Sequence, residues 1–169
     1  MIKFTLAAAA FALWAAPAAA ETLHYTAALN GQQTPTITGS MATGVATVDV
    51  DVEAQTVSVS MDVSGISLDD LYDHVIHAGV GPVHLHLYGE NGEISLLVPF
   101  PYGAAYSDMA GGFRLAIDDL PYAENAARVG SALTFQQFVQ TLSSDFVYLN
   151  IHTDAVHDGE ISGRLAPAD

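Results

Sequence analysis

The sequence contains no cysteine, and only four of its 169 residues are lysine or arginine, against 19 aspartate and glutamate residues. Without cysteine the chain can form no disulfide bond and offers no thiolate to a metal ion. Any transition-metal site must therefore use His, Asp, Glu or Met side chains. The formal net charge of −15 makes the surface repel nucleic acid and anionic membranes. We therefore expect no nucleic acid and no membrane among the partners, whereas a cation is a partner that this charge attracts.

Motifs of the common enzyme classes are missing as well. The chain has no Gly-x-Ser-x-Gly nucleophile motif and no Gly-rich phosphate-binding loop. Carboxylates are so plentiful that no particular pair stands out as an acid and base couple. We therefore assign no catalytic residue and no organic cofactor, and we expect a binding role rather than catalysis.

Long apolar runs are restricted to the N-terminus. Lys3 supplies a positive start, an apolar run follows from residue 4 to 16, and an Ala-x-Ala pattern ends at Ala20, directly before Glu21. These are the three regions of a secretory signal peptide. A transmembrane anchor is the alternative, but the run is too short and too rich in alanine to span ~20 residues comfortably. We predict a cleaved signal peptide over 1–20, one domain over 21–169, and a periplasmic or secreted protein.

Apolar residues then recur with a period of two, which is typical of half-buried antiparallel strands. Strands are expected within 22–31, 44–52, 55–66, 82–89, 93–100, 111–117, 145–153 and 159–166. One segment, 135–142, has helical spacing instead, with Thr134 as its N-cap. The Gly-, Pro- and Tyr-rich stretch 99–112 indicates a long loop. The sequence thus predicts an all-β fold, an antiparallel Greek-key β-sandwich or barrel with one short helix.

Histidine is unusually common, with seven residues in the chain. In the predicted strand 82–89, His84 and His86 alternate with Val83, Leu85 and Leu87. Both imidazoles should therefore lie on the face opposite the core, with Cα atoms roughly 7 Å apart. Imidazoles at that separation can converge on one metal ion with bonds of about 2.0 Å.

A second histidine group strengthens this reading. His152 ends a later predicted strand on its polar face, and His157 follows in an acidic turn. A cluster of imidazoles without thiolate is typical of Cu(II) or Zn(II), whereas oxygen ligands alone would suit calcium or magnesium. Met61 or Met109 beside the cluster would favour Cu(I). The candidate metal ligands are His84, His86, His152, His77, His74 and His157.

Two functions remain open at this point. In the first, the chain is an exported copper-binding protein, with zinc as the alternative metal, that buffers or delivers copper or uses it in redox chemistry. Its partners would be a metal ion, a copper donor or acceptor protein, and a second copy of the chain in a homodimer. In the second, the chain is an exported interaction module in which Asn150, His152, Thr153 and Glu160 only hold the fold together by hydrogen bonds.

The C-terminal run "YLNIHTDAVHDGEISGRL" resembles the closing signature of the CHRD domain, a family named from chordin. The matching positions are Tyr148, Asn150, His152, Thr153, Gly159, Glu160, Ile161 and Gly163. The His-x-His element of that family is similar to "VHLHLYG", and its opening is similar to residues 25–51. The resemblance covers about 23–166 and implies an exported β domain.

A second resemblance concerns the copper/zinc superoxide dismutases. The run "VHLHLYGENG" is similar to the strand that carries two of their copper ligands, and "NIHTDAVHDGE" to a later strand end with another histidine. The resemblance implies a dismutase-like barrel with His84, His86 and His152 as copper ligands. If there is catalysis, it implies a copper-dependent oxidoreductase of dismutase type, with Arg164 in the place of the catalytic arginine.

Overall fold

The structure of the protein is a computed structural model that describes residues 21–33 and 37–168. The predicted signal peptide, residues 1–20, lies outside the described residues. Within the described part of the chain, no helix has both the length and the apolar character needed to cross a membrane.

Ten antiparallel strands form a single sheet in the order β5-β4-β8-β9-β1-β2-β3-β7-β6, with β10 added beside β1. The sequence-adjacent strands β1, β2 and β3 pair as hairpins, whereas β4 pairs with β5 and β8 on the other half of the sheet. The strands are β1 Thr22–Asn30, β2 Thr43–Asp51, β3 Thr56–Ser64, β4 Val83–Tyr88, β5 Ile94–Phe100, β6 Tyr106–Met109, β7 Gly112–Pro121, β8 Val147–Ile151, β9 Ile161–Arg164 and β10 Ala166–Pro167.

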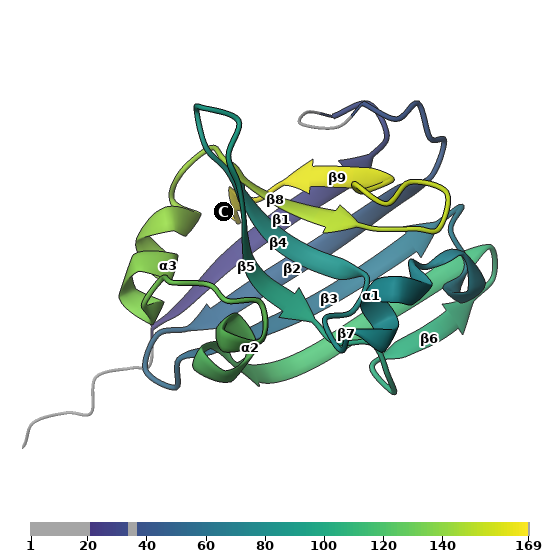
Figure 1. Ribbon diagram of the computed structural model, residues 1–169. Coiled ribbons are helices and arrows are strands. Elements are labelled where there is room, and N and C mark those ends of the chain that lie inside the picture. Colours follow the sequence, from purple (N-terminus) through teal and green to yellow (C-terminus); the bar gives the residue numbers. More distant parts are fainter. Residues whose placement is uncertain (1–20, 34–36, 169) are drawn as a thin grey trace, which may run out of the picture.

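The sheet curls so that its two halves face each other. Figure 1 shows β4, β5 and β8 in front of β1, β2, β3 and β7, which gives the molecule a sandwich-like cross-section. The all-β antiparallel fold predicted from the sequence is therefore confirmed, with one continuous curled sheet forming both layers.

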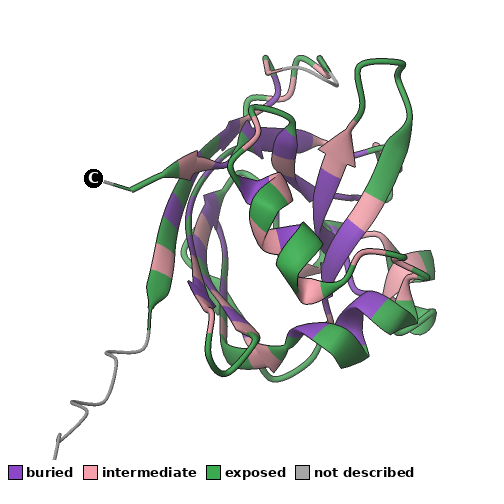
Figure 2. Ribbon diagram, turned by 90° about the vertical axis from the view of Figure 1, so that its left-hand side faces the viewer, coloured by how far each residue is buried: buried purple, intermediate pink, exposed green. Residues whose placement is uncertain are grey.

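The core lies between these two layers. Val48 and Val50 of β2 and the valines of β3 are buried at alternate positions, while the polar residues between them face outward. Figure 2 shows the same alternation of buried and exposed positions along the strands. Because β-branched side chains pack well on a pleated, half-buried surface, this pattern explains why these segments form strands.

The helices close the ends of the sandwich. The predicted helix is confirmed as α3, Phe135–Leu142, and the Thr134 hydroxyl accepts a hydrogen bond from the Gln137 amide in a capping box. The prediction of a single helix is incomplete, because the structure also contains η1 (Leu68–Asp70), α1 (Asp73–His77) and α2 (Tyr122–Arg128). These are too short for helical periodicity to separate them from loops.

The predicted loop over 99–112 is wrong in part. β5 ends at Phe100, in agreement with the predicted strand 93–100, but β6 forms within the stretch as an edge strand beside β7. The Tyr106 side chain turns inward, and its hydroxyl donates to the Phe100 carbonyl at 2.7 Å. This contact joins positions only six residues apart and anchors the strand, and the Gly- and Pro-rich composition of the stretch conceals it.

Candidate metal centre

Three histidines meet where β4 and β8 pair. His84 lies directly opposite Asn150 in this antiparallel pair, and His86 lies opposite Tyr148. His152 follows the end of β8, where its amide donates to the Pro82 carbonyl at 2.8 Å. Each of the three imidazoles offers one nitrogen such that all three nitrogens lie within 4.8 Å of one another.

The three rings are buried, with only 3% of His84, 8% of His86 and 8% of His152 exposed. The alternation with leucine and valine predicted one shared face for His84 and His86, and that face is more enclosed than a solvated strand face. The enclosure arises because the chain after β8 turns back over the site, where the His157 carbonyl contacts the His152 ring. A surface-loop segment therefore covers a polar strand face.

The hydrogen bonds of the three rings indicate which nitrogens are free to bind a metal ion. The His152 Nδ1 lies 2.7 Å from the His157 carbonyl oxygen, an acceptor, so this nitrogen carries the proton and Nε2 presents its lone pair. The Nε2 atoms of His152 and His86 are 3.4 Å apart. Both ring nitrogens of His84 and the Nδ1 of His86 are buried without a hydrogen-bond partner among the described residues.

The environment keeps all three rings neutral. Burial, together with the nearby His152 and His86, holds the pKa of His84 well below its usual value, although the backbone of Gly81 acts in the opposite direction. Burial and the neighbouring His152 lower the pKa of His86 to about 3. Burial also lowers the pKa of His152, although its bond to the His157 carbonyl acts in the opposite direction. Neutral imidazole is the form that binds metal ions.

The other three predicted ligands lie outside this group. His74 and His77 are on the short helix α1, and both are exposed. The His77 ring pairs with Asp73 one turn earlier. The His157 ring stacks on Tyr72, with centroids 4.2 Å apart, while only its backbone carbonyl reaches the cluster. A ligand role for these three residues stays a prediction.

A separate hydrogen-bond network ties the loop after β8 to the rest of the fold. The Glu160 carboxylate accepts from the Thr153 hydroxyl at 2.6 Å and from the Ser40 hydroxyl at 2.7 Å. The Thr38 hydroxyl donates to the Glu160 carbonyl at 2.7 Å. Thr38, Ser40 and the stack on Tyr72 cannot be predicted from the sequence, because no local pattern relates positions so far apart in the chain.

Another contact at the site is that between Asn150 and Tyr88. Asn150 is fully buried, and its Nδ2 donates to the Tyr88 hydroxyl at 2.6 Å. Its Oδ1 has no partner among the described residues. Asn150 thus lies on the strand face of the three histidines and contributes no charge there.

Arg164 and Arg114 are engaged away from the histidine cluster. Arg164 on β9 pairs with Asp145, and Arg114 makes two hydrogen bonds of 2.6 and 2.8 Å to Asp62. Arg164, which the dismutase resemblance places in the position of the catalytic arginine, is therefore bound to a carboxylate. Neither arginine supplies a free positive charge that would guide an anionic substrate to the cluster.

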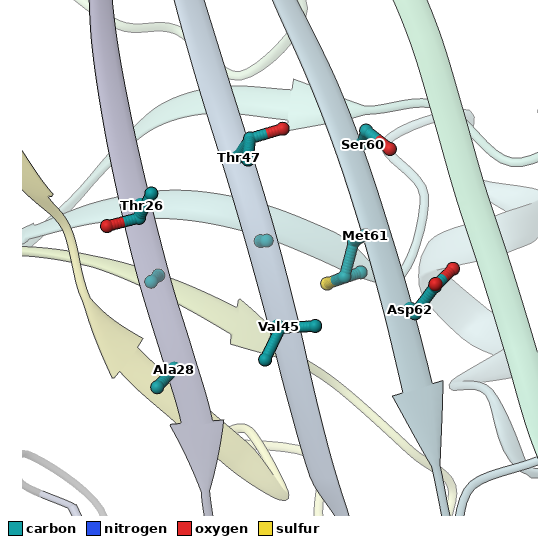
Figure 3. Close-up of a pocket in the computed structure, with 9 residues that line it drawn as sticks. Thr26, Ala28, Val45, Thr47, Ser60, Met61 and Asp62 are labelled. Atoms are coloured by element: carbon teal, nitrogen blue, oxygen red, sulfur yellow. The ribbon is translucent and has the colours of Figure 1, made fainter. Parts of the chain in front are cut away.

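A pocket on the outer face of β1, β2 and β3 is distinct from the histidine cluster. Figure 3 shows its lining of small and hydroxyl-bearing side chains, with Val45 at the centre and Asp62 at one side. The Asp62 carboxylate is already bound by Arg114. This hollow therefore holds no second group of metal ligands.

Fold and site together define an all-β, antiparallel domain with a buried three-histidine cluster at one strand pair. The model of the CHRD domain family matches residues 25–165, so the chain belongs to the CHRD domain family. No curated protein matches the chain.

Two glycines of the C-terminal signature have a structural explanation. Gly159 has a φ of +110°, and a Cβ there would lie 3.1 Å from the Asn150 Nδ2. A Cβ on Gly163 would lie 2.6 Å from the Ala28 carbonyl oxygen, because β9 crosses close to β1. The signature therefore includes positions that bring the loop after β8 close to the histidine-bearing face.

Proposed function

We propose that this CHRD domain is an exported copper-binding protein whose site consists of His84, His86 and His152. One observation carries the proposal, namely the buried ring nitrogens of His84 and His86 that have no hydrogen-bond partner among the described residues. Burying a polar group without a partner costs about 1–3 kcal/mol by protein mutational data. A metal ion bound by one of the His84 nitrogens would offset the cost at that atom, since each imidazole gives one nitrogen to the ion.

The chemistry of the donors supports copper. Imidazole nitrogens suit copper and zinc, whereas magnesium and calcium prefer oxygen. Copper(II) binds nitrogen sites more tightly than zinc in the general order of divalent affinities, so zinc is the second choice. The separation of 3.4 Å between the Nε2 atoms of His86 and His152 also suits a shared ion. Two nitrogens bound at about 2.0–2.1 Å with angles near tetrahedral lie about 3.4 Å apart.

Export and a role in copper handling complete the proposal. The N-terminal sequence has the regions of a signal peptide, and the acidic composition attracts cations in the surrounding solution. Binding by three buried rings favours holding or transferring the ion over turnover of a diffusing substrate. The expected partners are the copper ion itself and a protein that donates or accepts it.

The alternative of a metal-free interaction module accounts for a different part of the structure. The bonds of Glu160 to Thr153 and Ser40 explain how the loop after β8 is held. They do not explain why His84 has two unpartnered nitrogens in the interior. The histidine cluster therefore favours the metal site.

A titration of the purified protein with Cu(II) and Zn(II) at neutral pH tests the proposal. We expect one ion per chain and a loss of affinity of about hundredfold or more in the variant His84→Ala/His86→Ala, because two of three ligands are removed. The matched control is His74→Ala/His77→Ala, which removes two exposed histidines of α1 and should leave the affinity unchanged.

Circular dichroism verifies that both variants are folded. Absence of stoichiometric binding of Cu(II), of Zn(II) and, without oxygen, of Cu(I) by the unmodified protein would leave the interaction module as the function. Loss of binding in the α1 variant alone would place the site on α1. A loaded protein that accelerates superoxide loss would make the dismutase-type oxidoreductase the function.

A further inference from the structure

The charge of the histidine site distinguishes it from sites built for divalent ions. All three donors are neutral imidazoles, and no carboxylate of the described residues belongs to the group. The adjacent polar side chain on the same strand face is the neutral amide of Asn150. Asp158 is near enough for its charge to act on His152 and Tyr88, but it is exposed to solvent.

We infer that the His84–His86–His152 site selects monovalent copper, Cu(I), over Cu(II) and Zn(II). This inference rests on the proposed function, since it names the form of copper that the same site holds.

The first argument is electrostatic. The free energy of moving an ion from water into a medium of low dielectric constant grows with the square of its charge. It is therefore about four times larger for a divalent ion than for a monovalent ion of similar size. A buried divalent ion therefore needs anionic ligands beside it, and the three-histidine group supplies none. An exposed carboxylate such as Asp158 is screened by water and compensates the charge weakly.

The second argument concerns the number of ligands. Zinc in protein sites is almost always four-coordinate, and Cu(II) favours square-planar or tetragonal arrangements of at least four donors. Cu(I) has a filled d shell and forms stable complexes with three donors. At least 92% of the surface of each of these histidine residues is shielded, with exposed fractions of 3%, 8% and 8%. Such enclosure leaves little access for the water that would complete a four-coordinate divalent site.

Met61 and Met109, whose thioether groups would favour Cu(I), do not belong to the site. Met61 is buried in the core on β3, between the partners Ala46 and Leu115, and Met109 is exposed on the edge strand β6. The preference for Cu(I) therefore depends on charge and ligand number in the histidine site itself.

Three dissociation constants of the unmodified protein test the inference. Cu(I) is measured without oxygen by competition with bicinchoninate, and Cu(II) and Zn(II) by competition with nitrilotriacetate. We expect the Kd for Cu(I) to be lower than those for Cu(II) and Zn(II) by about hundredfold or more, in line with an uncompensated extra charge in a site of low dielectric constant. Equal or tighter binding of either divalent ion would overturn the inference and leave the proposed function intact. Failure of all three ions to bind would overturn both.

A charge variant on the same strand face gives a second readout. In the unmodified protein the Tyr88 hydroxyl accepts a hydrogen bond from Asn150. In Asn150→Asp the side chain has nearly the same shape, and its carboxylate can accept a hydrogen bond from that hydroxyl. Because directly paired residues have Cβ atoms about 5 Å apart, the new carboxylate lies near the ion bound by His84. We expect it to reduce the preference for Cu(I) over Zn(II) by about tenfold or more.

Tyr88→Phe is the matched control for this variant. It removes the same hydrogen bond and adds no charge, so the ratio of the two affinities should change less than about threefold, as for a neutral hydrogen bond of ordinary strength. A ratio that is unchanged in Asn150→Asp, or that falls equally in Tyr88→Phe, would contradict the electrostatic origin of the selectivity.

Discussion

At the scale of single residues, His152 and His157 contribute to the histidine cluster in different ways. His152 presents its ring to the cluster, whereas His157 contributes only its backbone carbonyl, which accepts from the His152 Nδ1. A backbone acceptor persists whatever side chain residue 157 carries. It fixes the tautomer and the ring orientation of a ligand, as outer hydrogen bonds commonly do in metal sites.

We predict that His157→Ala changes the copper affinity by less than about threefold, whereas His152→Ala reduces it by about hundredfold or more. The first variant loses the stack on Tyr72, which is worth about 0.5–1.5 kcal/mol of stability for an aromatic pair. Chelator competition measures the affinity, and urea denaturation measures the stability. A loss of affinity in His157→Ala as large as that in His152→Ala would make the His157 ring a ligand.

At the scale of elements, the cap of α3 is a feature that the sequence specifies locally. The Thr134 hydroxyl accepts from the Gln137 amide, and the Gln137 side chain accepts from the Thr134 amide in return. We predict that Thr134→Ala lowers the free energy of unfolding by about 1 kcal/mol, because orphan amides of the first turn lose their partner. Gln136→Ala, at an exposed position of the same helix, should change it by less than about 0.5 kcal/mol. Equal effects of the two substitutions in urea denaturation would contradict a capping role.

The element scale also explains where sequence reasoning succeeds. Strands β2 and β3 follow from alternation of valine with polar residues, and α3 follows from its cap, because the signals lie within ten residues. Strand β6 also pairs locally, with β7, but its four residues show no alternation of apolar and polar side chains, so the period of two does not reveal it. For the site, alternation placed His84 and His86 on one face. The burial of the three rings depends on how the loop after β8 folds back, which the sequence does not encode locally.

At the scale of the whole molecule, the three buried histidines couple folding to pH. In the unfolded chain their pKa is near 6.5, whereas burial lowers the pKa of each in the folded protein, for His86 to about 3. Below pH 6.5 the unfolded state therefore binds more protons than the folded state, and acid favours unfolding. Stability is complete above pH 6.5 and is lost progressively as the pH falls toward the folded pKa values.

We predict that lowering the pH from 7 to 5 reduces the free energy of unfolding of the metal-free protein by about 2 kcal/mol for each of His84 and His86, and that His152 adds to this loss. Urea denaturation across this range measures the loss. The carboxyl groups of Asp62 and Asp70, whose pKa values are lowered by their hydrogen bonds to Arg114 and Ser67, affect stability only near and below pH 4. The histidine contribution is therefore measurable by itself.

Two comparisons assign this loss to the cluster. His84→Gln removes one titrating group and should reduce the loss of stability between pH 7 and 5 by that ring's contribution, about 2 kcal/mol. Bound copper competes with protons for the same nitrogens, so the loaded protein should keep its stability to lower pH than the metal-free protein. A stability that is flat between pH 7 and 5 without metal would show that the three rings do not stay neutral in the folded state. The enclosure that makes the cluster a metal site would then be absent in solution.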